Sequence, residues 1–181
     1  MRIFIGVWLS PEMRQELAAE IGRLQKNVTG YKWTRPENLH FTLKFLGEVE
    51  PARIAPLERD LSAVTIGINS FLVRLGNPGC FPPRGQPRVI WIGLAAGAGE
   101  LKNLADQVEE ACLQNGFPKE SKPFKPHLTI ARVRDGAHPG AIANFSPQFS
   151  SETIVTGFAL IESQLYPSGP VYHTLTGFPL K

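Results

Sequence analysis

Two short stretches of the chain, His40-Phe41-Thr42-Leu43 and His127-Leu128-Thr129-Ile130, decide how the sequence is interpreted. Both follow the pattern His-x-Thr-apolar, and both lie in segments where apolar and polar residues alternate as they do in a β-strand. Because side chains two apart on a strand point to the same face, the His and the Thr of each copy share a face. Two such strands side by side would direct two imidazoles and two hydroxyls to one point, which suits a phosphate undergoing acid–base chemistry.

The sequence around these motifs alternates between helix and strand patterns. Apolar residues at spacings of three and four predict helices over 11–28, 51–64 and 99–115, and Ser10 before Pro11 is typical of a helix start. The connection over 134–150 is expected to hold at most a short helix near Pro139–Asn144. Strands are expected over residues 2–9, 31–33, 39–46, 70–76, 88–94, 127–133, 152–165 and 171–179.

This order of elements predicts an α+β fold. Helices interspersed among strands favour mixed or antiparallel sheets with the helices packed outside. The order splits loosely into two halves, and each half carries one His-x-Thr strand and at least one helix. We therefore expect residues 1–181 to form one domain of two lobes, each of which contributes one motif.

The composition excludes several classes of protein. Hydrophobic residues make up 43% and charged residues 19%, as in an ordinary globular protein, and the net charge of +3 is a mild basic bias. The cysteines, Cys80 and Cys112, form no CxxC or Cys/His cluster, which argues against disulfides and structural zinc. No stretch approaches the roughly 18 apolar residues of a membrane span. With no signal-peptide cleavage site near the N-terminus, we expect a cytoplasmic protein that does not associate with membranes.

The repeated motif suits the hydrolysis of a cyclic phosphodiester. That reaction needs one proton taken from the attacking water and one given to the departing sugar oxygen, on opposite sides of phosphorus. Imidazole suits both roles because its unperturbed pKa is about 6.5. The hydroxyls of Thr42 and Thr129 can donate hydrogen bonds to the nonbridging oxygens, where charge builds up. Such a site needs neither a metal nor a cofactor. The competing interpretation, two half-buried strand histidines bonded to backbone, does not explain why the phrase occurs twice.

The residues around both motifs resemble a known family. Residues 33–49, WTRPENLHFTLKFLGEV, resemble the first signature of the RNA 2′,3′-cyclic phosphodiesterases. These belong to the 2H phosphoesterase superfamily and are also called the 2′-5′ RNA ligase family. Residues 124–132, FKPHLTIAR, resemble the second signature, and residues 163–172 are similar to the C-terminal pattern of the family. The likeness spans nearly the whole chain.

This resemblance implies a two-lobed, pseudo-symmetric fold whose central cleft carries both His-x-Thr strands. It implies metal-independent opening of a terminal 2′,3′-cyclic phosphate of RNA, tRNA fragments included, to a 2′-phosphomonoester. We assign His40 as the proton donor to O3′ and His127 as the proton acceptor from water, with Thr42 and Thr129 binding the phosphate. We expect the chain to act as a monomer.

Arg132 has two interpretations. It matches the arginine that follows the second motif in the family, and a guanidinium can bind a phosphate through two hydrogen bonds. Strict alternation, however, places Arg132 on the strand face opposite His127. Either the strand contains a bulge and Arg132 binds phosphate, or Arg132 forms a structural ion pair.

Several other residues have a functional and a structural interpretation. Alternation places Phe45 inward and Lys44 outward, where we expect a solvated strand-end lysine in preference to a phosphate contact. Tyr172 is expected in the core or in the cleft wall. Three aromatic residues could stack a base but are expected to pack in the core, and four basic loop residues could add weak backbone contacts. The aromatic residues are Trp33, Phe81 and Phe124, and the basic ones are Arg84, Arg88, Lys122 and Lys125.

Three other functions would use the same residues. A 2′-5′ RNA ligase runs the reaction in reverse through the same site. A phosphodiesterase on 2′-5′-linked or small cyclic nucleotides needs the same acid–base pair, so the sequence does not separate these from the main hypothesis. A non-catalytic module that binds RNA ends would differ, because replacing His40 or His127 by alanine would leave its function intact.

Overall fold

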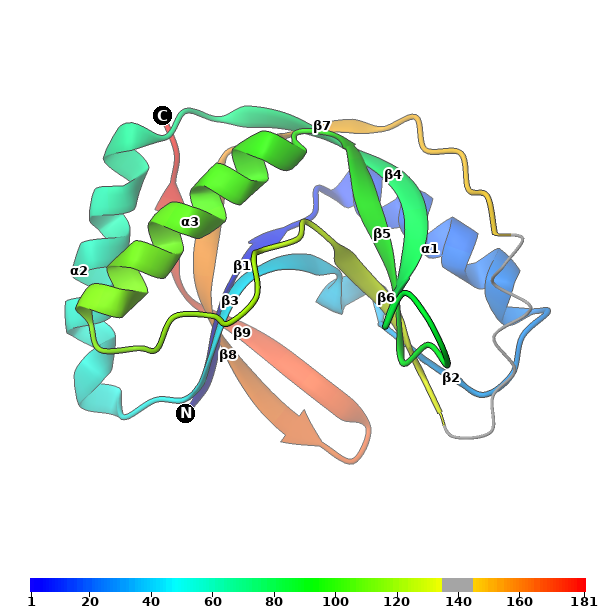
Figure 1. Ribbon diagram of the computed structural model, residues 1–181, viewed down its shortest axis with the longest axis horizontal. Coiled ribbons are helices and arrows are strands. Elements are labelled where there is room, and N and C mark those ends of the chain that lie inside the picture. Colours follow the sequence, from blue (N-terminus) through cyan, green and yellow to red (C-terminus); the bar gives the residue numbers. More distant parts are fainter. Residues whose placement is uncertain (135–144) are drawn as a thin grey trace.

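The computed structural model describes residues 1–134 and 145–181, which form two antiparallel sheets (Figure 1). The first sheet has the strand order β3-β1-β8-β9, and the second has the order β2-β6-β5-β4-β7. Strands of the first sheet are β1 (Arg2–Trp8), β3 (His40–Glu48), β8 (Gly157–Tyr166) and β9 (Gly169–Pro179). Strands of the second are β2 (Tyr31–Trp33), β4 (Phe71–Phe81), β5 (Val89–Ala96), β6 (Leu128–Val133) and β7 (Glu152–Val155). The predicted α+β class and two-lobed arrangement are confirmed, and each sheet contains one motif strand.

Two of the described helices pack on the sheet opposite to the one whose strand precedes them in the sequence. Helix α1 (Pro11–Gln25) follows β1 of the first sheet but lies beside the second (Figure 1), where Glu16 accepts hydrogen bonds from Ser150 just before β7. Helices α2 (Ile54–Val64) and α3 (Ala98–Gln114) pack together on the first sheet, although α3 follows β5 of the second. Short 3-10 turns cover Pro36–Asn38, Pro51–Arg53 and Thr65–Gly67. One continuous apolar core therefore includes residues of both sheets.

The helix starts and stripes follow the sequence pattern. The Ser10 hydroxyl accepts a hydrogen bond of 3.2 Å from the backbone N–H of Met13, and Pro11 occupies the first helical position of α1. Met13, Leu17 and Ile21 are buried at spacings of four, as predicted.

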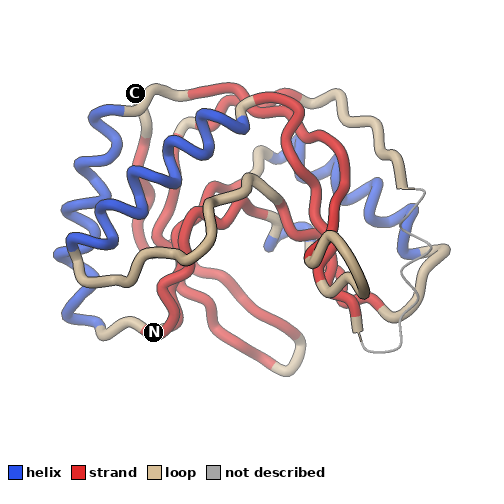
Figure 2. The backbone as a smooth tube through the Cα atoms, in the orientation of Figure 1, coloured by secondary structure: helices blue, strands red, loops and turns tan. Residues whose placement is uncertain are grey.

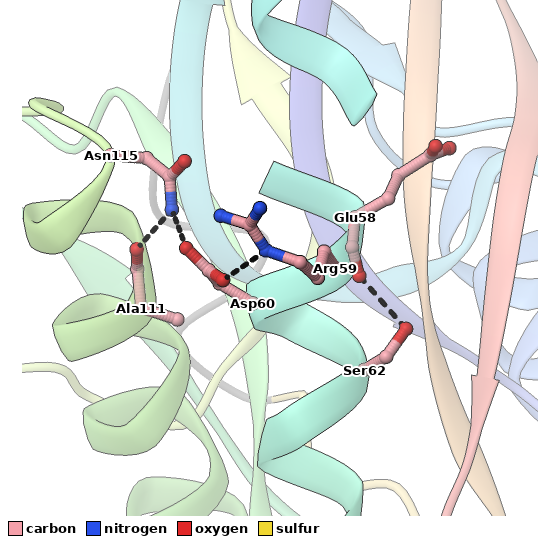
Figure 3. A network of polar contacts seen from close by, with 6 residues as sticks. All are labelled: Glu58, Arg59, Asp60, Ser62, Ala111 and Asn115. Carbon is pink, nitrogen blue, oxygen red and sulfur yellow. Dashed lines mark hydrogen bonds and ion pairs between the residues drawn. The ribbon is translucent and has the colours of Figure 1, made fainter. Parts of the chain in front are cut away.

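Polar contacts join α2 to the C-terminal end of α3 (Figure 3). The Asn115 side-chain amide donates to the Asp60 carboxylate at 2.8 Å and to the Ala111 carbonyl at 2.9 Å. The same carboxylate accepts from the Arg59 guanidinium, and these hydrogen bonds lower the pKa of Asp60. This network fixes the two helices against each other.

A β-bulge interrupts the first motif strand directly after Thr42. Thr42 lies opposite Gly6 of β1 and Lys44 lies opposite Ile5, which leaves Leu43 as an extra residue. The bulge reverses the alternation, so Lys44 is 3% exposed and Phe45 is 44% exposed. The expectations of a solvated Lys44 and an inward Phe45 are therefore wrong.

A matching bulge follows Thr129 in the second motif strand. Thr129 lies opposite Trp91 of β5 and Ala131 lies opposite Ile90, so Ile130 is the extra residue. The side chain of Arg132 is consequently on the face of Thr129. Of the two interpretations of Arg132, the structure supports the bulge, and no ion pair of Arg132 occurs among the described residues.

Helix α1 ends at Gln25 and α2 begins at Ile54, inside the predicted ranges 11–28 and 51–64, and two strand predictions differ more. Strand β4 continues through Gly76 to Phe81, because a register shift between Leu75 and Pro78 accommodates a proline that has no N–H to donate. The predicted strand over 152–165 is two strands, β7 and β8, which belong to different sheets. The short helix predicted near Pro139–Asn144 lies outside the described residues. None of the described helices has the length and apolar character that crossing a membrane requires.

Candidate active site

A cleft of about 360 Å³ lies between the two sheets, where β3 and β6 contact each other. The four residues of the repeated phrase all line it: His40 and Thr42 from the first sheet, His127 and Thr129 from the second. The β8–β9 hairpin, which projects from the body of the molecule (Figure 2), contributes a further wall through its turn. The structure thus brings together residues that are 87 positions apart in the sequence.

The hairpin turn is fastened to the segment just before the first motif. The guanidinium of Arg35 donates to the Ser168 carbonyl at 2.7 Å, and the Asn38 side-chain amide donates to the Pro170 carbonyl at 2.9 Å. Asn38 is 6% exposed, so this contact lies in a largely dehydrated place. These bonds hold the hairpin wall at a fixed distance from His40.

His40 is held by backbone and by its own motif threonine. Its Nδ1 donates to the Asn38 carbonyl at 2.6 Å, because a carbonyl can only accept. In the neutral ring Nε2 therefore carries the lone pair, and it lies 3.0 Å from the Thr42 hydroxyl. Three aromatic rings surround the imidazole at centroid distances of 4.7 to 5.6 Å: Phe4, Trp8 and Tyr172.

This environment makes His40 a weak base in the free protein. Burial lowers the pKa of His40 to about 4, the backbone hydrogen bond with Asn38 opposes that shift, and the charge of His127 lowers the pKa further. His40 is consequently neutral at pH 7. Both imidazoles line one cleft, and the charge of one acts on the pKa of the other.

His127 has a similar backbone anchor in a more open setting. Its Nδ1 donates to the Lys125 carbonyl at 2.7 Å, so its Nε2 is the ring nitrogen left for a substrate. The rings of Phe81 and Trp91 meet the imidazole edge-on at 5.1 and 6.2 Å, and the Lys125 ammonium lies 4.4 Å from the Trp91 ring centre. Burial lowers the pKa of His127, and the charge of Lys125 lowers it further, against the backbone hydrogen bond with Lys125, which raises it.

Two glycines make room for these arrangements. A Cβ on Gly6 would lie 2.9 Å from the Phe41 carbonyl oxygen and 3.3 Å from the His40 ring. A Cβ on Gly79 would lie 2.2 Å from the Trp91 indole. Glycine in a strand interior often marks such a close approach. Gly6 leaves room for the His40 ring, and Gly79 leaves room for the Trp91 indole that contacts His127.

The other predicted residues divide into cleft and non-cleft positions. Arg132, Tyr172 and Trp33 line the cleft. Phe81 contacts His127 without lining the cleft, Phe124 packs partly buried against the core, and Lys44 pairs with Glu109 away from the cleft. Arg84, Arg88, Lys122 and Lys125 are not among the residues lining the cleft.

The sequence prediction missed several cleft residues. Arg2 and Phe4 of β1 share one strand face, and Lys32 precedes the cleft residue Trp33. The signal for β1 was present, because positions 2, 4, 6 and 8 alternate with buried Ile3, Ile5 and Val7. A strand so apolar also fits burial on both faces, so its sequence alone does not identify a cleft-facing side. Phe45 was missed because only the bulge turns it into the cleft.

The arrangement can supply proton transfer and anion binding. Two Nε2 atoms, two hydroxyls and four cationic side chains face one space, whose lining contains no Asp or Glu among the described residues. Nor do three or more His, Cys, Asp or Glu side chains gather as metal ligands within residues 1–134 and 145–181. The positive charge of the cleft therefore suits an anionic substrate, and the imidazoles of His40 and His127 are available to transfer protons to or from it.

Comparisons with known proteins agree with this geometry. The chain matches the family described as LigT like Phosphoesterase twice, over residues 7–91 and 92–172, and each match contains one His-x-Thr phrase. An Archaeoglobus fulgidus protein named RNA 2′,3′-cyclic phosphodiesterase is 39% identical over 98% of this chain and 99% of its own length. A Thermus thermophilus protein of the same name is 37% identical over 100% of this chain and 91% of its own length. A crystal structure of a Thermus thermophilus protein has a TM-score of 0.83 and 34% identity, over 99% of this chain and 98% of that one.

Proposed function

Because the chain belongs to the LigT-like phosphoesterase family, we propose that it hydrolyses the 2′,3′-cyclic phosphate at the end of an RNA strand to a 2′-phosphomonoester. The observation that carries the proposal is the paired anchoring of the histidines. In each, Nδ1 is committed to a backbone carbonyl two residues earlier, so each presents Nε2 as its reactive nitrogen to one cleft. An in-line displacement needs two such groups, one at each pole of phosphorus.

The reaction balances with these two residues. Nε2 of His127 takes a proton from a water molecule as the water oxygen attacks phosphorus. The bond from phosphorus to O3′ breaks, and protonated Nε2 of His40 gives its proton to O3′. The products are a 2′-phosphomonoester and a free 3′-hydroxyl. Both histidines have then exchanged their protonation states, and proton exchange with solvent restores them.

The bound substrate prepares His40 for its role. The free imidazole has a pKa of about 4 because burial disfavours its cation. A phosphodiester anion beside Nε2 favours that cation and raises the pKa toward neutrality. The substrate thus supplies the charge that makes His40 an effective acid, and an empty site holds the ring neutral.

The motif threonines and Arg132 complete the binding of the substrate. Hydroxyls of Thr42 and Thr129 donate to the nonbridging oxygens, where negative charge increases in the transition state. Arg132 is on the face of Thr129 and contributes a fixed positive charge on the same side of the cleft.

The setting of the reaction belongs to the same proposal. Both histidines come from one chain, so a monomer holds a complete site, and no metal takes part. RNA ends in the cytoplasm, tRNA fragments among them, are the substrates that this chemistry suits.

Incubation of RNA ending in a 2′,3′-cyclic phosphate with the protein in EDTA tests the proposal. We expect the cyclic end to open, and the product to resist a phosphatase specific for 3′-phosphates. Persistence of the cyclic end, or opening only when a divalent metal is added, would contradict the proposed function. A 3′-phosphate product would contradict the choice of O3′ as the leaving atom.

A further inference from the structure

Two cations lie directly opposite each other on the cleft face of the second sheet. Lys32 of β2 is the register partner of Arg132 of β6, and both line the cleft. Like charges at directly opposed positions of an antiparallel pair are destabilising. Neither side chain forms an ion pair or a side-chain hydrogen bond with a described residue. The free protein therefore keeps an unfavourable pair that a bound anion would relieve.

A third cation approaches from the first sheet. Arg2 lies two residues before Phe4 on β1, on the same strand face, and the Phe4 ring packs 4.7 Å from the His40 ring. Two residues along a strand span about 7 Å, so Arg2 lies beyond His40 and not beside it. Its guanidinium lies 5.0 Å from the Phe45 ring centre, and its register partner Glu48 forms its ion pair with the α-ammonium of Met1.

The Tyr172 phenol is affected by the positive charges of both Arg2 and Arg132. Burial raises the pKa of the Tyr172 phenol, and the positive charges of Arg132 and Arg2 both oppose that rise. One arginine comes from each sheet, so their fields overlap at this phenol across the cleft. The Tyr172 ring also meets the His40 ring edge-on at 5.3 Å, so the phenol on which both arginines act belongs to a ring that contacts the first motif histidine.

The number of cations exceeds what the reacting phosphate requires. A cyclic phosphodiester carries a single negative charge, and the two histidines, the two threonines and Arg132 already address it. Of the other cations lining the cleft, Arg35 is engaged by the Ser168 carbonyl, which leaves Arg2 and Lys32. Two further positive side chains without a carboxylate partner match a second anion next to the first.

We propose that Arg2 and Lys32, which line the cleft together with Arg132, form a second anion site that binds the phosphate on the 5′ side of the terminal nucleotide. This inference rests on the proposed phosphodiesterase function, because the RNA strand supplies both phosphates. The cyclic phosphate lies at the histidines and Arg132, and the next phosphate of the strand lies one nucleotide away, at Arg2 and Lys32. The site makes the enzyme prefer a nucleotide that carries a 5′-phosphate over one that ends in a 5′-hydroxyl.

The test compares two mononucleotides that differ in one group. Adenosine 2′,3′-cyclic phosphate has a 5′-hydroxyl, and its 5′-phosphorylated counterpart carries the second anion. We expect kcat/KM to be roughly tenfold or more higher for the 5′-phosphorylated substrate at low salt, since charge-assisted contacts to phosphate are among the strong ones. The preference should shrink as salt is added. Lys32→Ala and Arg2→Ala should each lower the ratio of the two kcat/KM values toward one.

Matched controls separate this site from general charge effects. Lys26→Ala removes one positive charge at the end of α1, outside the cleft, and should leave the ratio unchanged. Lys32→Ala should also raise the urea midpoint of the ligand-free protein, because it removes the repulsion from Arg132. A merely structural role of Lys32 would lower that midpoint and leave the ratio unchanged.

The outcomes distinguish the two proposals. If the wild type hydrolyses both nucleotides with equal kcat/KM, the second anion site is contradicted and the phosphodiesterase function stands. A preference that persists in Lys32→Ala and Arg2→Ala would contradict the second anion site in the same way. If neither nucleotide nor cyclic-ended RNA is hydrolysed, the proposed function fails and the second site falls with it.

Discussion

The two motif strands share one backbone plan but differ in what surrounds it. In both, the histidine Nδ1 donates to the carbonyl two residues earlier, and a one-residue bulge follows the threonine. After the bulge, β3 continues with buried Lys44 and then Phe45, which faces the cleft. Strand β6 continues with buried Ala131 and then Arg132, which also faces the cleft. The shared backbone arrangement fixes the direction of both Nε2 atoms, and the different surroundings set the pKa of each imidazole.

This comparison teaches how a near-symmetric site becomes two unequal halves. The first half encloses His40 among three aromatic rings and has its buried charge, Lys44, paired with Glu109 behind the strand. The second half places His127 beside Phe81 and Trp91 and presents Arg132 to the cleft. Burial lowers the pKa of both histidines, and only the second half adds the charge of a neighbouring lysine, Lys125. Such unequal environments suit one acid and one base.

Loss of either histidine is expected to have the largest effect. His40→Ala and His127→Ala should each lower kcat on cyclic-ended RNA by roughly 10²–10⁴, since each removes one proton transfer. The double variant should lose little more than the worse single variant, because the pair acts as a unit. Single-turnover hydrolysis of a labelled RNA measures all three. Full hydrolytic activity in either single variant would contradict the paired-histidine mechanism, whereas RNA binding that both substitutions leave unchanged, without hydrolysis by the wild type, would favour a non-catalytic RNA-binding module.

The buried ion pair of the first half gives the next prediction, on stability. Lys44 lies 2.8 Å from Glu109 and 2.9 Å from the Pro118 carbonyl, and its side chain is almost fully buried. Lys44→Met leaves the Glu109 carboxylate without its cation, and we expect a loss of about 3 kcal/mol in the free energy of unfolding.

Urea titration measures this loss, and the double variant provides the control. Lys44→Met combined with Glu109→Gln should recover much of the stability, since replacing both partners removes the uncompensated charge. The equivalent position of the second half, Ala131, holds no charge, which shows that the backbone plan does not need one. Equal stability of Lys44→Met and the wild type would contradict this account of the pair.

The pH dependence of stability is expected to be smaller. Unfolded His40 binds a proton below its ordinary pKa of about 6.5, but the folded protein holds that pKa at about 4. Between these values the unfolded state binds more protons, so the free energy of unfolding rises with pH and falls as the solution is acidified. The contribution of His40 is at most about 3 kcal/mol.

Replacing the titrating group checks this assignment. His40→Gln should flatten the acid side of the stability curve between about pH 6.5 and 4 relative to wild type. His127, whose pKa is also lowered, accounts for part of the slope that remains. Parallel curves for the two proteins would show that His40 is already protonated at the acid end of the native range.

Much of this molecule could be predicted from sequence, and the failures have a common cause. Period-two and period-four patterns locate most strands and helices, and the repeated phrase locates the four central cleft residues. Lys44, Phe45 and Arg132 were not placed correctly by alternation because each lies just after a bulge, and a bulge is set by cross-strand pairing. The alternation of β1 places Arg2 on the face of Phe4, but the sequence does not show that this face, or Lys32, lies at the cleft, because the cleft forms only where the two sheets meet.

The roles of the two histidines are tested most directly by changing the leaving atom. A cyclic substrate with sulfur in place of the bridging O3′ expels a thiolate, which needs no proton because thiols are far more acidic than alcohols. We predict that His40→Ala recovers most of its lost activity on this substrate, whereas His127→Ala stays impaired because water must still be deprotonated. Recovery in His127→Ala alone would reverse the assignment, and recovery in neither would contradict the acid–base pair.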